Sequence, residues 1–123
     1  QVGITVDVQP AEMLVYADEG LVSQGVVNLL KNAREAVAAQ PDARIDVRAR
    51  IDEGENIRID VTDNGKAIPA AVTENIFTPF FTTKPDGSGI GLSVSRRIMQ
   101  LHNGSLRLTS NTDHRVTFTL LFE

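Results

Sequence analysis

Runs in which apolar and polar residues alternate predict five strands in this chain, separated by segments with helical or turn character. The expected strands cover residues 4–8, 45–51, 57–61, 105–109 and 116–122. The first has the alternation of a half-buried strand. A turn rich in Asp, Glu, Gly and Asn joins the second and third strands, and the last two are expected to pair as a closing hairpin.

A long helix is predicted between the first two strands. It begins at Asp18, a suitable N-cap, and ends at Ala39, before the helix-stopping sequence Gln-Pro-Asp. Apolar residues three, four and seven positions apart share one face of this helix, which should be buried. They are Val22, Val26, Leu29, Leu30, Ala33 and Val37.

A second face of the same helix is polar and carries Asn28, Asn32 and Glu35. Two shorter helices are predicted over residues 70–75 and 90–101, the second stopped by the Asn-Gly pair that follows it. Helices segregated from mostly sequential strands favour an α/β (α+β) two-layer sandwich, with a mixed sheet of about five strands packed on about three helices. All 123 residues are expected to form one domain, 1–123.

Composition narrows the classes of function. The net charge of −4 argues against a dedicated nucleic-acid binder. The absence of cysteine excludes disulfides, thiol catalysis and cysteine-based zinc sites. No apolar run reaches the length of a membrane span and no secretory signal opens the chain, so we expect no direct membrane contact. Because the chain begins in a strand-like run without Met, we expect it to be part of a larger protein.

A cluster of three glycines interrupts the chain before the last helix, in the sequence PDGSGIGLS at residues 85–93. Glycines allow backbone N–H groups to approach a ligand closely, and the following helix N-terminus attracts anions, so the cluster indicates a phosphate loop. It lacks the Gly-Lys-Ser/Thr ending of a P-loop. It also lacks the preceding strand of a dinucleotide-binding fingerprint. A flexible surface turn is the ordinary alternative.

Four segments, in one order, give the cluster a context. Residues 28–33 (NLLKNA), 63–69 (DNGKAIP), 77–84 (FTPFFTTK) and 87–92 (GSGIGL) resemble the N, G1, F and G2 boxes. These boxes belong to the catalytic, ATP-binding domain of sensor histidine kinases, a branch of the GHKL superfamily. The resemblance covers nearly the whole chain.

The resemblance implies a Bergerat-type ATP-binding fold, with ATP and Mg²⁺ as cofactors. It assigns the magnesium contact to Asn32, because an amide oxygen suits Mg²⁺ beside phosphate and water oxygens. A solvated asparagine on a helix face is the ordinary alternative. The ATP-binding positions that it implies are Asn28, Asn32, Asp63, Gly65, Ala67, Ile68, Phe80, Lys84, Gly87, Ser88, Gly89, Ile90, Gly91 and Leu92.

Asn28 and Asn32 are the catalytic positions implied by the resemblance. In ATPase members of the superfamily the position of Asn28 is similar to a glutamate that activates water. An asparagine cannot act as a general base. We therefore expect a domain that holds ATP without efficient hydrolysis and transfers phosphate to a histidine.

By the same resemblance, Asp63 accepts a hydrogen bond from the adenine amino group, and Gly65 lets the backbone pass close to the base. An Asx turn at Asp63 is an equally good local interpretation. The family pattern Asp-x-Gly-x-Gly has Ala67 in place of its second glycine. If that glycine had a positive φ, alanine would cost about 1 kcal/mol and weaken nucleotide binding.

A lid is expected from residue 82 to residue 88, anchored by phenylalanines and folded over the triphosphate by the glycines. Phe77, Phe80 and Phe81 are otherwise core residues. Lys84 is a candidate phosphate contact, and so are Lys31 and Arg34. A solvated side chain is the alternative for each of these three.

The resemblance implies a two-component sensor kinase whose catalytic domain donates the γ-phosphate of ATP to a histidine on a separate helical dimerisation domain. A response regulator then receives the phosphate. Neither His102 nor His114 has the sequence surroundings of that acceptor, so the isolated domain should be inactive alone and monomeric. A cytoplasmic domain of an inner-membrane-anchored parent is expected. Alternatives are a degenerate interaction module, a GHKL ATPase or serine kinase, and an unrelated α/β domain.

Overall fold

The computed structural model describes residues 3–9, 19–78 and 91–122, and its elements follow the predicted order. The elements are β1 (Gly3–Gln9), α1 (Glu19–Ala36), β2 (Arg44–Ile51), β3 (Ile57–Asp63), α2 (Ala70–Thr73), α3 (Gly91–Leu101), β4 (Ser105–Thr112) and β5 (Arg115–Phe122). Among the described residues, no helix is both long and apolar enough to span a membrane.

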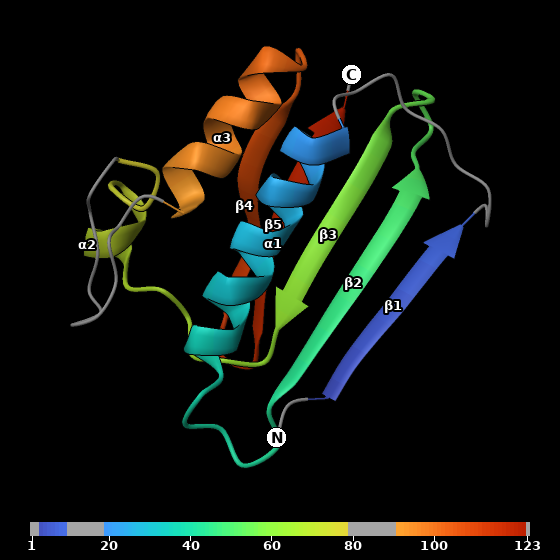
Figure 1. Ribbon diagram of the computed structural model, residues 1–123. Helices are drawn as coiled ribbons and strands as arrows, with labels where there is room; N and C mark the ends of the chain where they lie inside the picture. Colours follow the sequence, from blue (N-terminus) through green and yellow to red (C-terminus); the bar gives the residue numbers. More distant parts are fainter. Residues whose placement is uncertain (1–2, 10–18, 79–90, 123) are drawn as a thin grey trace.

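The five strands form one mixed sheet in the order β1-β2-β3-β5-β4 (Figure 1). Only β1 and β2 are parallel, and the other neighbours run antiparallel. The sheet thus brings the end of β3 next to the start of β5, where Asp63 lies opposite Val116. The predicted two-layer fold with a mixed sheet is confirmed.

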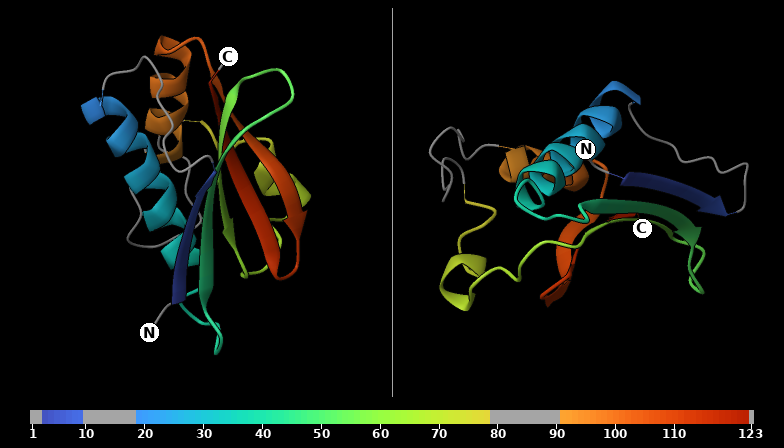
Figure 2. Two further views of the ribbon diagram at one scale, coloured as in Figure 1. Left: turned by 90° about the vertical axis from the view of Figure 1, so that its right-hand side faces the viewer. Right: turned by 90° about the horizontal axis from the view of Figure 1, so that it is seen from below.

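Helices α1 and α3 lie side by side on one face of the sheet (Figures 1 and 2). They meet where α1 has a glycine: the buried Ser95 hydroxyl of α3 donates to the carbonyl oxygen of Gly25 at 3.0 Å. A side chain at position 25 would contact Ile98 and Ser95. The glycine therefore lets the two helices pack closely over the sheet.

The core lies between these helices and the inner face of the sheet. Leu29, Ala33 and Val37 are buried, as the predicted apolar face requires, and Val22, Val26 and Leu30 are partly buried against the same core. The strands supply the opposite side of this core. Their buried apolar residues are Ile45, Val61, Leu106, Val116, Phe118, Leu120 and Phe122.

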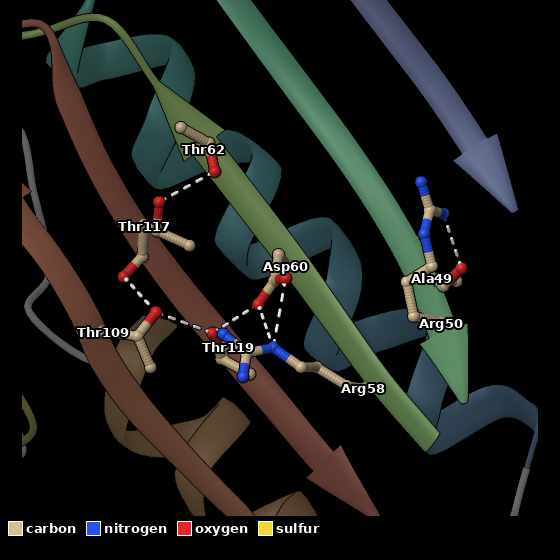
Figure 3. A network of polar contacts seen from close by, with 8 residues as sticks. All are labelled: Ala49, Arg50, Arg58, Asp60, Thr62, Thr109, Thr117 and Thr119. Carbon is tan, nitrogen blue, oxygen red and sulfur yellow. Dashed lines mark hydrogen bonds and ion pairs between the residues drawn. The ribbon is translucent and has the colours of Figure 1, made fainter. Parts of the chain in front are cut away.

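The outer face of the sheet carries polar side chains that bond to one another (Figure 3). The hydroxyls of Thr62 and Thr117 form a hydrogen bond at 2.8 Å. The Thr119 hydroxyl donates to Asp60 Oδ1, which also accepts a hydrogen bond from Arg58 Nε at 3.0 Å. This face also holds a cavity lined by Thr5, Asp7, Asp46, Arg48, Thr62 and Arg115. Because α1 and its asparagines lie on the other side of the sheet, that cavity is separate from the candidate site.

The ends of four elements differ from the prediction. Helix α1 ends at Ala36 rather than Ala39, because Ala38 and Gln40 donate to the carbonyls three residues before them and so form tighter turns. Strand β3 continues through Asp63, and β4 continues to Thr112. The short helix α2 ends at Thr73.

Strand β1 is present as predicted. The prediction that one of its faces is buried was wrong within the described part of the chain. Ile4, Val6 and Val8 are 40–68% exposed. Among the described elements α1 packs over β2 and β3 instead, which leaves the apolar residues of this edge strand without cover from either long helix.

Candidate functional site

The polar face of α1 forms one edge of the candidate site. Asn28, Asn32 and Ala36 lie four residues apart, so they follow one line along the helix, about 12 Å long at 1.5 Å per residue. Asn28 and Asn32 are both half-buried. The amide oxygen of Asn28 accepts a hydrogen bond from Gln24 Nε2 at 3.0 Å, which orients this side chain along the helix.

One end of this line meets the start of α3. Gly91 is the first residue of that helix, and a Cβ built on it would lie 4.0 Å from the Cβ of Asn28. The structure therefore brings the end of the glycine cluster beside the N box, although the two are far apart in sequence. Gly91 lies in a helix, as the predicted helix over residues 90–101 requires.

The other end of the line meets the loop after β3. A Cβ on Gly65 would lie 2.8 Å from the carbonyl oxygen of Ala36 and 2.9 Å from Asp63 Oδ1. Both distances are too short for a side chain, so this position needs glycine in order to pass the end of α1. Close approach to the helix is thus a structural requirement for Gly65, independent of any ligand.

Asp63 is the last residue of β3 and is only 2% exposed. Its Oδ1 accepts a hydrogen bond from the backbone N–H of Gly65 at 2.9 Å. The Asx turn that the sequence left as an alternative is therefore present. The same carboxylate stands at the end of a central strand, beside the loop formed by residues 64–69.

Ala67 has no left-handed backbone. The described non-glycine residues with positive φ are Glu55, Asn103 and His114, and Ala67 is absent from this group. The cost expected for alanine at position 67 required a positive φ, so no such cost arises here. Ala67 is half-buried, and its N–H donates to Asp113 Oδ1 at 3.0 Å.

The end of β4 and the turn that follows it contribute residues that the sequence did not single out. Asn111 and Asp113 bond to the backbone of residues 67 and 68, and His114 donates its backbone N–H to the Gly65 carbonyl at 2.8 Å. The signal that could have found them was the run Asn-Thr-Asp-His-Arg between two strands, which is a turn by composition.

Comparison with known proteins decides what this arrangement belongs to. The family described as histidine kinase-, DNA gyrase B- and HSP90-like ATPases matches residues 17–123. The solved catalytic domain of the histidine kinase ThkA has 31% sequence identity and a TM-score of 0.86, covering 98% of this chain and 78% of that one. The chain belongs to the family of histidine kinase catalytic domains.

Two curated relatives agree with this membership. The signal transduction histidine-protein kinase AtoS of Escherichia coli K12 is 39% identical over 87% of this chain. The sensor protein FixL of Bradyrhizobium diazoefficiens is 38% identical over 89%. The chain spans only 17% and 22% of the length of these two proteins, so it corresponds to one part of each. The family is an ATP-binding one.

Within this histidine kinase domain, several predicted positions lie outside the described residues. They are Asp18, Phe80, Phe81, Lys84, Gly87, Ser88, Gly89 and Ile90. Lys31 and Arg34 are described and are exposed on α1. Ile68 and Leu92 are partly buried against the core rather than open to solvent.

Two further side chains have structural partners. Phe77 packs edge-on against Phe118 with ring centroids 6.2 Å apart, and the guanidinium of Arg96 lies 5.7 Å above the same ring. His102 directly follows the last residue of α3, and its Nδ1 lies 2.7 Å from the Ile98 carbonyl oxygen. Phe77 is partly buried against the core, as predicted.

Proposed function

We propose that this histidine kinase domain binds Mg·ATP along the polar face of α1. The base would lie against Asp63 and residues 65–68, and the phosphates beside Asn28, Asn32 and the start of α3. The observation that carries the proposal is the line of residues on α1, which has Gly91 at one end and Gly65 at the other. The N box therefore lies on α1, and the G1 and G2 boxes meet the two ends of this line.

Asn32 would hold magnesium in this arrangement. Among the described residues no group of three or more His, Asp or Glu side chains is arranged to bind a metal ion. One amide oxygen from Asn32 fits Mg²⁺, because this ion keeps several waters and takes its other oxygens from nucleotide phosphates. When bound, the ion would neutralise charge that develops on the transferred phosphoryl group.

The chain's own residues would bind and orient rather than abstract a proton. The amide of Asn28 cannot act as a general base. Asp63 lies beside Gly65, at the end of the α1 line that would receive the adenine and not the phosphates. The γ-phosphoryl group would pass to a histidine on a separate helical domain of the parent kinase, and from there to a response regulator. We propose that the domain lies in the cytoplasm, in a parent anchored in the inner membrane, and that the isolated domain is monomeric.

The degenerate-module alternative depended on Ala67. The absence of a positive φ at this residue and the bond from its N–H to Asp113 favour a loop that accepts alanine without strain. The ATPase alternative requires a general base at position 28, where this chain has asparagine.

Calorimetric titration with ATP, with and without magnesium, tests the proposal. We expect magnesium-dependent binding that Asn32→Ala weakens at least about tenfold, since a metal-ligand contact is lost. Asn56→Ala is the matched control, because Asn56 lies in the turn between β2 and β3 at the opposite end of β3 from Asp63. No binding at millimolar ATP by the folded domain would contradict the proposal, and steady ATP turnover would favour the ATPase.

A further inference from the structure

We infer that Asn111 and Asp113 are positioning residues for the nucleotide base, because they hold residues 65–68 in the conformation that receives it. The inference rests on the proposed function, which assigns the base to this loop. Neither residue belongs to the four boxes. They act through the backbone of the loop.

The loop after β3 depends on partners from elsewhere in the chain. It lies between β3 and α2, so its backbone groups lack the regular partners of a helix or a sheet. The turn between β4 and β5 supplies them. Asp113 Oδ1 accepts from Ala67 N at 3.0 Å, and His114 N donates to the Gly65 carbonyl oxygen at 2.8 Å.

Asn111 makes a two-way contact with one residue of the loop. Its Oδ1 accepts from Ile68 N at 2.7 Å and its Nδ2 donates to the Ile68 carbonyl oxygen at 2.9 Å. An amide is the side-chain group that can both accept and donate in this way. Both bonds are partly buried, so water replaces them poorly when the side chain is removed.

A bulge in β4 aims Asn111 at the loop. The pairing of β4 with β5 shifts between Leu108 and Ser110, so the alternation of faces along β4 changes there. After the shift Asn111 lies opposite Val116, which is itself the partner of Asp63 on β3. The positioning residue and the base-recognising carboxylate thus share one rung of the sheet.

The same contacts account for the tolerance of alanine at position 67. Hydrogen bonds from outside the loop fix its conformation, so the loop does not need the backbone freedom that the family's glycine would supply. The loop is attached to Asp113 at Ala67 and to Asn111 at Ile68, while Gly65 rests against the Ala36 carbonyl. The base end of the site is therefore built by three separate elements: α1, β3 and the last hairpin.

Comparing the affinities of two ligands distinguishes a loss of base positioning from general damage to the domain. We would measure binding of Mg·ATP and of magnesium with inorganic triphosphate, by displacement of a fluorescent ATP analogue. Asp113→Ala should weaken ATP about three- to tenfold, the range for loss of one hydrogen bond, and leave triphosphate unchanged. Asp113→Asn keeps an acceptor oxygen for Ala67 N and should restore ATP affinity.

Asp52→Ala is the control, because Asp52 also accepts backbone N–H bonds in a hairpin turn, but far from the loop. Asn111→Ala should weaken ATP by about tenfold or more, since two bonds are lost. If that variant fails to fold, the Asp113 pair still decides the question because its single bond is exposed.

The outcomes are distinct. ATP affinity equal to wild type in Asp113→Ala, or equal losses for ATP and triphosphate, would overturn the positioning role and leave the proposed function standing. A folded wild-type domain that binds neither ligand would overturn the proposed function, and this inference with it.

Discussion

The two hairpin turns of the sheet use an aspartate in opposite ways. In the turn between β2 and β3, Asp52 Oδ1 accepts bonds from Gly54 N and Asn56 N, both at 2.9 Å, within its own loop. In the turn between β4 and β5, Asp113 Oδ1 accepts from Ala67, which belongs to another loop. Each turn also has one non-glycine residue with positive φ, Glu55 at 63° and His114 at 71°.

This difference separates a turn that stabilises itself from a turn that supports a site. The first turn closes a hairpin and makes no bond outside it among the hydrogen bonds of the described residues. The second closes a hairpin and also holds the loop beside Asp63. Local sequence gives the two aspartates the same interpretation, so only their partners distinguish them.

The largest expected effect concerns the glycines of the two regions. Gly65→Ala should lower the free energy of unfolding by about 1–3 kcal/mol, because the new methyl group meets the Ala36 carbonyl, which cannot move without shifting α1. Gly54→Ala should cost less than about 0.5 kcal/mol, because its nearest atom is Asn56 Nδ2, the end of a flexible side chain at 3.3 Å. Urea unfolding of both variants checks this, and equal losses would contradict it.

A smaller effect should reverse its order between two assays. Asp52→Ala removes two backbone bonds and should lower the free energy of unfolding by about 1 kcal/mol. Asp113→Ala removes one and should cost about half as much. In ATP binding the order should be opposite, with a loss only for Asp113→Ala. Both variants remove one negative charge, so thermal unfolding and titration of the pair compare like with like. The same order in both assays would remove the distinction between the turns.

The smallest expected effect is shared by the turns. Glu55→Gly and His114→Gly each relieve a left-handed backbone, but glycine also makes the unfolded chain more flexible. We expect a net gain of a few tenths of a kcal/mol in each, about what these opposing contributions leave. ATP affinity should not change, because the backbone N–H of His114 that bonds Gly65 is kept. Loss of stability in His114→Gly alone would assign a contact to the imidazole.

Much of the fold could be predicted because its signals are local. The apolar face of α1 follows from the helical repeat, and the strand that ends at Asp63 follows from alternation. The N and G1 boxes could be assigned from their residues, and the structure brings Ala36, one turn after Asn32, against Gly65. That contact depends on where α1 ends relative to β3, and neither the helical repeat nor the alternation of the strand specifies this position.

The sequence pattern marks a turn around Asn111 and Asp113, but it does not predict that these residues support another loop. The alternation of β4 is interrupted at Thr109 and Ser110, and an interruption is typical of a strand end. In the structure it is a bulge, and the strand continues to Thr112. Whether such a break ends a strand or bends it depends on pairing with β5, a property of the sheet rather than of the segment.

The position of Asp63 also has a consequence for folding kinetics. This residue pairs with Ile45 on one side and Val116 on the other, and the second pairing closes much of the chain into a loop. Such distant pairings are slow to form, because their entropic cost precedes their stabilisation. The loop after β3, where we propose that the base binds, should therefore form after α1 and the β2–β3 hairpin during refolding. In a stopped-flow experiment, recovery of nucleotide binding would then report the docking of the last hairpin.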